Sequence, residues 1–545
     1  MAANLDTSGL SPHWTDPDVL IIGAGASGAA VAWYLSSAGF KVVCLEQGDW
    51  IRQDELTHGH DDWEIHRLTD FHADPNVRKR PEDYPVNDLD SAISPLMFNA
   101  VGGSTIHWSA HFPRYHPSDF RVRTLDGVGD DWPFKYDELE PWYDLNDRMI
   151  GVSGVNGDPS QPPRSFRPMP PLPIGTLGTT MAAGFEKLGW HWWVSDGAIA
   201  STAYGDGRQA CNFCGPCDLG CPNGARSSAD VTYWPAALKF GTELRTRCRV
   251  REITVDQQGR ARGAVYYGPD GTLHEQKAAM VVVAANGIGT PRLLLNSKSA
   301  RFPDGLANRS GLVGKNLMFH PFASVNGYFP DMIDGYKGPI GNAILSHEFY
   351  ETDLRRGFVR GFQMQAVRQS GPVRESLGGF VQDRVPWGRN HHRMFDERFN
   401  RTISLGVMGE DLPETINEVA LDPNLCDSDG IPAPLVRYRL SENSRKILDF
   451  GVARAAEALT AAGATGTFAL NPMKPSGWHL LGTCRMGESP MGSVINGYGQ
   501  SHDVSNLFVV DGSAFVTSAA INPTPTIQAI ALRCADYIKR TRGQS

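Results

Sequence analysis

A strand, a glycine turn, a helix and a second strand follow one another within residues 18–46, and this unit constrains the fold more than any other feature. Val19–Ile22 is a short apolar run of the kind found in buried parallel strands. Residues 29–38 have a helical pattern that Gly39 ends, and residues 41–45 form the next apolar run. Parallel strands joined by a helix belong to layered α/β folds. The chain is therefore predicted to open on a βαβ unit.

The turn of this unit has the G-x-G-x-x-G spacing, with Gly23, Gly25 and Gly28 as its glycines and Ser27 before the last of them. The first glycine allows a tight turn, the second lets the backbone approach a pyrophosphate, and the third lets the helix pack on the strand. The helix N-terminus then favours phosphate. Glu46 closes the second strand, at about the 20-residue spacing of a ribose-binding carboxylate. The unit predicts a dinucleotide site for a nicotinamide or a flavin; the alternative is a plain glycine-rich turn.

Length, patterning and charge limit the remaining possibilities. The 545 residues suggest several structural units of roughly 100–200 residues each. Aromatic and alternating segments between about 322 and 470 suggest an antiparallel sheet, hence a second domain of another class. The net charge of −9, without a long basic run, argues against nucleic acid or an anionic membrane as partner. Residues 19–40 are uncharged, but their glycines favour the βαβ interpretation, so no membrane span is expected.

The N-terminal segment bears on location. Residues 1–17 have neither a basic stretch nor an apolar core, so no secretory signal is expected. The predicted location is cytoplasmic. The alternative is periplasmic, by co-export with a partner subunit.

Four further segments resemble the glucose–methanol–choline (GMC) oxidoreductase family, in the family's order and over nearly the whole chain. They are residues 100–104, 286–294, 313–321 and 479–526. The branch that they resemble most comprises the flavin subunits of bacterial sugar and polyol dehydrogenases, which residues 131–141 also resemble. The resemblance implies an FAD cofactor and an α/β fold. A Rossmann-like FAD-binding domain would be joined to a second, antiparallel-sheet domain that binds the substrate.

The resemblance also implies how the chain is divided. The FAD-binding domain is expected to be discontinuous, from residues 17–130, 205–320 and 475–545. The substrate-binding or cap domain is expected from residues 131–204 and 321–474.

Cofactor-binding residues are carried over from the family position by position. The first turn and Glu46 would hold the ADP half of FAD, and Val250 would pair with the adenine. Asp511 and Gly512 would contact the ribitol phosphate, while Pro523 and Thr524 would approach the isoalloxazine. The remaining residues implied for FAD binding are Gly102, Gly103, Ser104, His107 and Ala285.

His479 is the candidate catalytic base. In the family, a histidine at this place takes the hydroxyl proton while hydride leaves for flavin N5, and Asn522 fills a second position that is histidine in some members. Imidazole suits this because its ordinary pKa near ~6.5 leaves it neutral at working pH. The expected function is FAD-dependent oxidation of a sugar, polyol, glycoside or other CH–OH donor. Alternatives are an oxygen-using oxidase, a lyase on the same fold, a non-catalytic electron carrier and, for His479 alone, a buried core histidine.

His107 follows the glycine turn at a spacing similar to that of pyranose oxidases. In those enzymes the matching histidine carries the flavin through a covalent bond. The resemblance therefore implies covalent FAD through His107 as one alternative. The other is a histidine that only packs on the flavin ring.

Four cysteines crowd into one short run: Cys211, Cys214, Cys217 and Cys221. The spacing is that of bacterial ferredoxin ligands, whereas zinc normally uses two separated pairs. A disulfide pair or a plain loop are further alternatives. The sugar dehydrogenases of the most similar branch carry a three-iron cluster here, with their first cysteines spaced differently. An iron–sulfur cluster would pass electrons to an external acceptor or to a small accessory or electron-transfer subunit; without it, oxygen becomes the favoured acceptor.

Overall fold

The computed structural model describes residues 14–56, 61–164, 166–368, 371–378 and 385–542. Most of the N-terminal segment that was examined for a secretory signal lies outside these residues. Within the described part of the chain, no helix is both long and apolar enough to cross a bilayer.

The first sheet is parallel throughout, with the strand order β17-β9-β1-β2-β5. Its strands are Val19–Ile22 (β1), Val42–Leu45 (β2), Glu243–Arg245 (β5), Met280–Val283 (β9) and Leu507–Val509 (β17). All residues of β1 and β2 are buried, as expected of central parallel strands. Because β2 and β9 lie on opposite sides of β1, the strand order reverses there, and such a switch point is where α/β sheets bind ligands.

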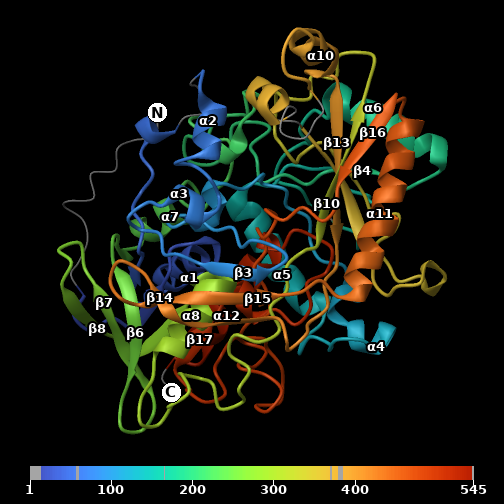
Figure 1. Ribbon diagram of the computed structural model, residues 1–545. Helices are drawn as coiled ribbons and strands as arrows, with labels where there is room; N and C mark the ends of the chain where they lie inside the picture. Colours follow the sequence, from blue (N-terminus) through green and yellow to red (C-terminus); the bar gives the residue numbers. More distant parts are fainter. Residues whose placement is uncertain (1–13, 57–60, 165, 369–370, 379–384, 543–545) are drawn as a thin grey trace.

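Helix α1 (Ala26–Ser37) begins three residues before the predicted helix, inside the glycine motif. Gly28 therefore lies in the first helical turn, where a side chain would collide with the backbone of the glycine loop at Gly23. The small residues of α1 let it pack closely against α7 (Tyr233–Lys239) and α12 (Thr524–Arg540). In Figure 1, α1 and α12 lie together at the centre of the lower half of the molecule.

The second sheet has the order β16-β10-β13-β12-β11-β4, and its pairs are antiparallel. Its strands are Trp193–Val194 (β4), Phe322–Tyr328 (β10), Ile344–Ser346 (β11), Phe362–Val367 (β12), Thr402–Gly409 (β13) and Gly466–Leu470 (β16). Figure 1 shows α11 (Glu442–Ala461) along this sheet, with α6 (Gly175–Leu188) beside it. The predicted fold class, a Rossmann-like FAD-binding domain with an antiparallel-sheet domain, is confirmed.

The central strand β13 has one face in an apolar core and the other face at a cavity. All eight of its residues are buried. Ile403, Leu405 and Val407 belong to the apolar core that α11 completes, whereas the alternating residues Ser404, Gly406 and Met408 line a cavity. The period of two along a strand thus places a serine, a glycine and a methionine on the cavity side.

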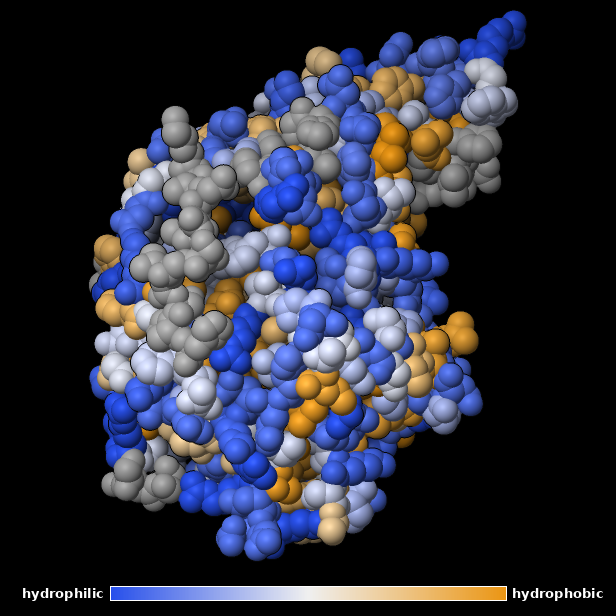
Figure 2. Space-filling view, turned by 90° about the vertical axis from the view of Figure 1, so that its left-hand side faces the viewer, coloured by the Kyte–Doolittle hydropathy of each residue, from blue (hydrophilic) through white to orange (hydrophobic). Residues whose placement is uncertain are grey.

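Two three-stranded sheets complete the fold. The first consists of β6 (Arg249–Val255), β7 (Ala261–Tyr267) and β8 (Leu273–Lys277). The second pairs β14 (Glu418–Cys426) and β15 (Pro432–Tyr438) with β3 (Asn87–Ser91), so it joins segments that the sequence assigned to different domains. The remaining helices are α2 (Trp63–Leu68), α3 (Pro75–Arg78), α4 (Val122–Asp126), α5 (Tyr136–Ile150), α8 (Asn286–Asn296) and α10 (His391–Arg398). The face in Figure 2 is mainly hydrophilic, with apolar residues in small separate groups.

Candidate active site

One cavity of about 500 Å³ joins the two main sheets. On one side it is lined by Ile22, Leu45 and Ala284, at the carboxyl ends of parallel strands. On the other side it is lined by the cavity face of the antiparallel sheet, including Ser404 and Met408. The cavity therefore connects a dinucleotide-type turn with a second domain of different architecture.

Close backbone contacts shape the turn after β1. A Cβ on Gly23, which has a φ of +103°, would lie 2.5 Å from the carbonyl oxygen of Ala284. A Cβ on Gly28 would lie 2.0 Å from the carbonyl oxygen of Gly23, and one on Gly103 would lie 2.9 Å from Cα of Gly25. No larger residue fits these positions without displacement. Gly25 precedes α1 without a side-chain cap, so the first N–H groups of the helix remain available to phosphate.

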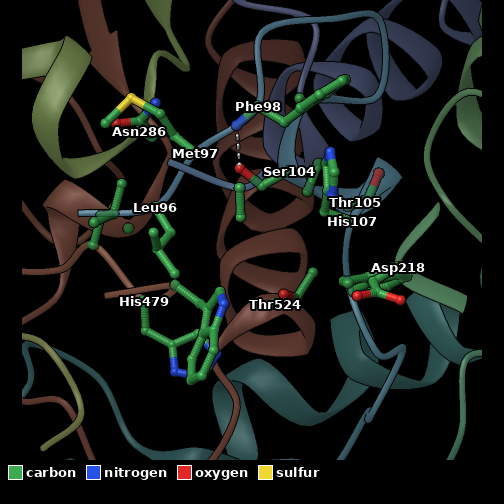
Figure 3. A pocket seen from close by; sticks show the side chains of 18 of the residues that line it. Leu96, Met97, Phe98, Ser104, Thr105, His107, Asp218, Asn286, His479 and Thr524 are labelled. Atoms are coloured by element: carbon green, nitrogen blue, oxygen red, sulfur yellow. Dashed lines mark hydrogen bonds between the residues drawn. The ribbon is translucent and has the colours of Figure 1, made fainter. Parts of the chain in front are cut away.

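The second glycine turn is bonded to the first. The Gly102 N–H donates to the carbonyl of Ala24 over 2.9 Å, and Gly102 itself has a φ of +98°. Ser104 accepts a hydrogen bond from the Phe98 N–H through its hydroxyl oxygen, at 3.2 Å, as the dashed line in Figure 3 shows. The Ser104 hydroxyl can still donate to a ligand in the cavity that it lines.

Glu46 is buried beside the first turn and lines the cavity. Its carboxylate accepts from the N–H of Ala24 at 2.8 Å and from the N–H of Gly48 at 2.9 Å. Each oxygen keeps a second lone pair, which a ribose hydroxyl can use. Burial raises the pKa of the Glu46 carboxyl to about 7. Glu46 thus orders the turn as well as facing the ligand.

Two glycines hold the segment that carries His479. A Cβ on Gly287 would lie 2.3 Å from the carbonyl oxygen of Leu480, and a Cβ on Gly512 would lie 2.4 Å from the same oxygen. Leu480 directly follows His479, so these close approaches fix the depth at which the histidine enters the cavity. Asp511 joins the same region, because its Oδ2 accepts from the N–H of Asn286 at 3.1 Å.

His479 contacts a second histidine that the sequence left without a role. Its Nδ1 lies 2.6 Å from Nδ1 of His320, and Nε2 of His320 lies 3.0 Å from the carbonyl oxygen of Ser518. Burial lowers the pKa of His320 to about 4. Burial, with the unfavourable protonation of both neighbouring rings as a further cause, also holds the pKa of His479 well below its ordinary value. Both rings are therefore neutral near pH 7.

This contact fixes the tautomer of His479. The Ser518 carbonyl can only accept, so His320 carries its proton on Nε2 and its Nδ1 is an acceptor. His479 must then donate through Nδ1. Its Nε2 keeps a free lone pair, and among the described residues no partner binds it. Since the ring lines the cavity, that lone pair is available to a substrate hydroxyl.

Asn522 is oriented by a comparable chain of contacts. Its Oδ1 accepts from Nε2 of Gln363 at 3.0 Å, and the Gln363 oxygen accepts from Nε2 of His347 at 3.4 Å. The Asn522 amide oxygen is thereby occupied, and its Nδ2 donor is left for the cavity that Asn522 lines. Pro523 and Thr524 follow at the N-terminus of α12, and Ile527 of this helix is half-buried and also lines the cavity.

His107 lines the same cavity as His479. In the view of Figure 3 the two residues lie on opposite sides. Its ring is 4.2 Å from the ring of Phe98, and its buried Nε2 has no hydrogen-bond partner among the described residues. Burial, with the charges of Arg78 and Arg226 as lesser causes, holds the pKa of His107 well below its ordinary value. A neutral ring with a free nitrogen is what either packing on a flavin or a bond to it requires.

The structure gathers almost all of the predicted FAD-binding residues around this cavity. The exceptions are Gly28 and Gly102, which do not line the cavity but belong to the two glycine turns. The residues at its wall are Gly23, Gly25, Ser27, Glu46, Gly103, Ser104, His107, Val250, Ala285, Asp511, Gly512, Pro523 and Thr524. The glycine contacts, the uncapped helix and the buried carboxylate all fit a dinucleotide, so the site fits FAD.

The four cysteines do not fit a metal cluster in this structure. Among the described residues, no three histidine, cysteine, aspartate or glutamate side chains are placed to hold a metal ion. Cys211 accepts from the N–H of Phe213 at 3.4 Å, and Cys221 accepts from the N–H of Arg226 at 3.3 Å. Burial raises the pKa of Cys211 to about 11, so its thiol stays protonated. The predicted iron–sulfur cofactor therefore has no site in this arrangement.

Three polar residues at or beside the site were missed by the sequence analysis: His111, His320 and Gln363. His320 lies in a segment that the resemblance covers, but nothing in the sequence showed that it meets His479. His111 follows His107 by four positions, which is about one helical turn. Because the segment has no helical pattern, this spacing gave only a weak signal. Gln363 lies on β12 and gave none.

The parallel sheet, its glycine turn and the cavity that leads from the turn to His479 define a dinucleotide-dependent oxidoreductase. Family profiles agree: an FAD dependent oxidoreductase profile matches residues 18–59, and GMC oxidoreductase profiles match residues 176–322 and 413–531. The chain is 47% identical over 534 residues to 2-methyl-1,2-propanediol dehydrogenase of Mycolicibacterium austroafricanum, covering 96% of this chain and 95% of that one. It belongs to the GMC oxidoreductase family. It is accordingly an FAD-dependent enzyme that oxidises an alcohol group.

Two further comparisons support the same family and fold. The chain is 31% identical to the fructose dehydrogenase large subunit of Gluconobacter japonicus, over 97% of this chain and 99% of that one. Among solved structures, pyridoxine 4-oxidase from Mesorbium loti matches with a TM-score of 0.65 at 17% identity, over 95% of this chain and 98% of that one. The second likeness concerns the fold alone.

Proposed function

We propose that this enzyme oxidises a short diol or polyol, with His479 as the base and Asn522 as the group that holds the reacting oxygen. The observation that carries the substrate class is the 47% identity, over nearly the full length of both chains, to a relative named for a small diol. Bound FAD would supply the hydride acceptor. The second relative, named for a sugar, belongs to the same broader class of polyhydroxylated substrates.

The two side chains complement an alcohol. The free Nε2 lone pair of His479 accepts the hydroxyl proton, and the free Nδ2 of Asn522 donates to the hydroxyl oxygen. The hydroxyl is thereby held with its proton directed at the base. Because His479 is neutral, it can take that proton as the carbon loses its hydride. An asparagine cannot share the proton, so the proton transfer rests on His479 alone.

The test is flavin bleaching without oxygen. We expect short diols to reduce the flavin of the wild-type enzyme, and His479→Ala to slow that reduction by roughly 10²–10⁴-fold while FAD stays bound. His392→Ala is the matched control, because His392 is exposed on α10 and does not line the cavity. Equal reduction rates in His479→Ala and the wild type would overturn the assignment. Reoxidation by oxygen and by artificial acceptors then separates an oxidase from a dehydrogenase.

We infer that any covalent FAD bond would be formed by His107, because this residue lines the cavity beside the Ser104 turn and its buried Nε2 has no hydrogen-bond partner among the described residues. We assign no catalytic step to an iron–sulfur cluster. Iron and acid-labile sulfide measured on anaerobically purified protein test that cofactor directly. Less than about a tenth of an equivalent of iron, with no paramagnetic signal, excludes it, whereas stoichiometric iron bound by Cys211, Cys214, Cys217 and Cys221 would require the loop to rearrange.

A further inference from the structure

His111 occupies a tightly determined place in the cavity wall. It is 2% exposed and lines the same cavity as His479. On either side of it, the Ala198 N–H donates to the carbonyl of Ala110 and the Phe112 N–H donates to the carbonyl of Asp196, both at 2.8 Å. Ala110 has a φ of +60°, a left-handed conformation that non-glycine residues seldom adopt. Such strain persists where the surroundings impose it, often at functional sites.

The ring of His111 makes no hydrogen bond of good geometry to any described residue, although the backbone of Gly341 and the side chain of Gln363 lie near it. Both Nδ1 and Nε2 are buried, and neither has a bond of acceptable geometry to any described residue. Burial lowers the pKa of His111 to about 4, so the ring is neutral and offers one N–H donor and one lone pair. Buried polar groups in proteins are nearly always satisfied. A neutral imidazole with both nitrogens free, in a cavity wall, is suited to a ligand group that both donates and accepts, as a hydroxyl does.

His111 lines the same cavity as the two residues that would hold the reacting alcohol, His479 and Asn522. Gln363, which binds Asn522, and the backbone of Gly341 lie near enough to the His111 ring to raise its pKa by weak hydrogen bonding, against the larger lowering by burial. His111 in turn lies close enough to His479 that the protonation of one ring disfavours that of the other. Three polar groups from separate segments of the chain therefore surround one part of the cavity. His479 and Asn522 suffice for one hydroxyl, which leaves His111 for another.

We propose that His111 binds a second hydroxyl of the substrate, on the carbon next to the one oxidised, and so selects 1,2-diols over simple alcohols. This inference rests on the proposed function, since it takes His479 and Asn522 as the site of the first hydroxyl. His111 is then a specificity residue: a simple alcohol leaves its nitrogens without a hydrogen bond of good geometry, whereas a diol can supply one.

The test compares 1,2-propanediol with 1-propanol and 2-propanol, each of which lacks one of the two hydroxyls. Anaerobic flavin reduction gives kcat/KM for each. We expect the wild type to favour the diol, and His111→Leu to reduce the ratio of diol to simple-alcohol kcat/KM by about tenfold, the worth of one or two neutral hydrogen bonds. His111→Asn, which keeps a donor and an acceptor, should recover part of the ratio. His392→Leu, on exposed α10, is the matched control and should leave it unchanged.

Three results would overturn the inference. A ratio that stays the same in His111→Leu would show that His111 does not sense the second hydroxyl. An equal loss for diol and simple alcohols, with an altered flavin spectrum, would place His111 on FAD instead. If the wild type reduces its flavin with simple alcohols as readily as with the diol, the inference fails while the proposed chemistry stands; if no alcohol reduces it, the proposed function itself fails.

Discussion

The contact between His320 and His479 makes the state of the base depend on a residue that touches no substrate in the proposed site. His320→Leu removes the acceptor for Nδ1–H of His479 and replaces it with an apolar side chain. The donor then lies in a buried wall without a partner. His479 can avoid this by moving its proton to Nε2, which removes the lone pair from the substrate side.

The structure sets the size of the effect. One buried hydrogen bond, with a nitrogen-to-nitrogen distance of 2.6 Å, holds the reactive tautomer. Leaving a buried donor unsatisfied costs about 1–3 kcal/mol, which corresponds to a roughly 5- to 150-fold shift between tautomers. We therefore expect His320→Leu to slow flavin reduction by that factor, less than the loss in His479→Ala. Diol binding should change little, since Asn522 keeps its orientation.

Stopped-flow reduction without oxygen measures the effect directly. His320→Gln is the informative companion variant, because a glutamine amide can accept from His479 with its oxygen and donate to the Ser518 carbonyl with its nitrogen. We expect the Gln variant to reduce much faster than the Leu variant. Reduction at the wild-type rate in His320→Leu, or equal slowing in both variants, would refute the tautomer argument and leave His320 a packing residue.

Three further outcomes follow from the site. Because burial lowers the pKa of His479 well below 6.5 and the base acts when neutral, flavin reduction should stay constant as pH falls through 6.5 and decline only at lower pH; a midpoint at or above 6.5 contradicts this. Glu46→Ala leaves the N–H groups of Ala24 and Gly48 without an acceptor, so this variant should purify largely without FAD. Glu46→Gln should retain more FAD. The flavin-to-protein absorbance ratio measures both. Acid precipitation should release yellow FAD to the supernatant; colour in the pellet, and a flavin peptide containing His107, would show a covalent bond instead.

The first βαβ unit was predictable because its determinants are local. One short segment contains the buried run of β1, the three glycines and the carboxylate at Glu46. The run forms a strand, the glycines permit the turn and its packing, and the carboxylate binds the turn. The helix start was misplaced, since the free N–H groups of the turn belong to the helix itself and Gly28 sits inside it. The antiparallel sheet could be expected only in outline, because the register of β10 on β13 is set by tertiary packing.

The polar contacts of the site could not be read from spacing. His320 and His479 are separated by 159 positions, and only the folded chain brings their nitrogens together. The cysteine run is a different case. Its spacing matched a ligand pattern, but Cys211 and Cys221 bond to nearby backbone N–H groups in the described structure. The described residues do not bring three such ligands together, so the iron–sulfur cluster stays a prediction that rests on the local spacing.

The Leu480 carbonyl, held between Gly287 and Gly512, has a consequence for the order of events during folding. Residues 287, 480 and 512 come from different segments of the chain, and the last of them is synthesised after the other two. The first glycine turn can form earlier, but His479 takes its final position in the cavity only when all three segments have packed together. Catalytic competence is thus a late event in maturation, and a chain that ends before Gly512 would lack the support that places its base.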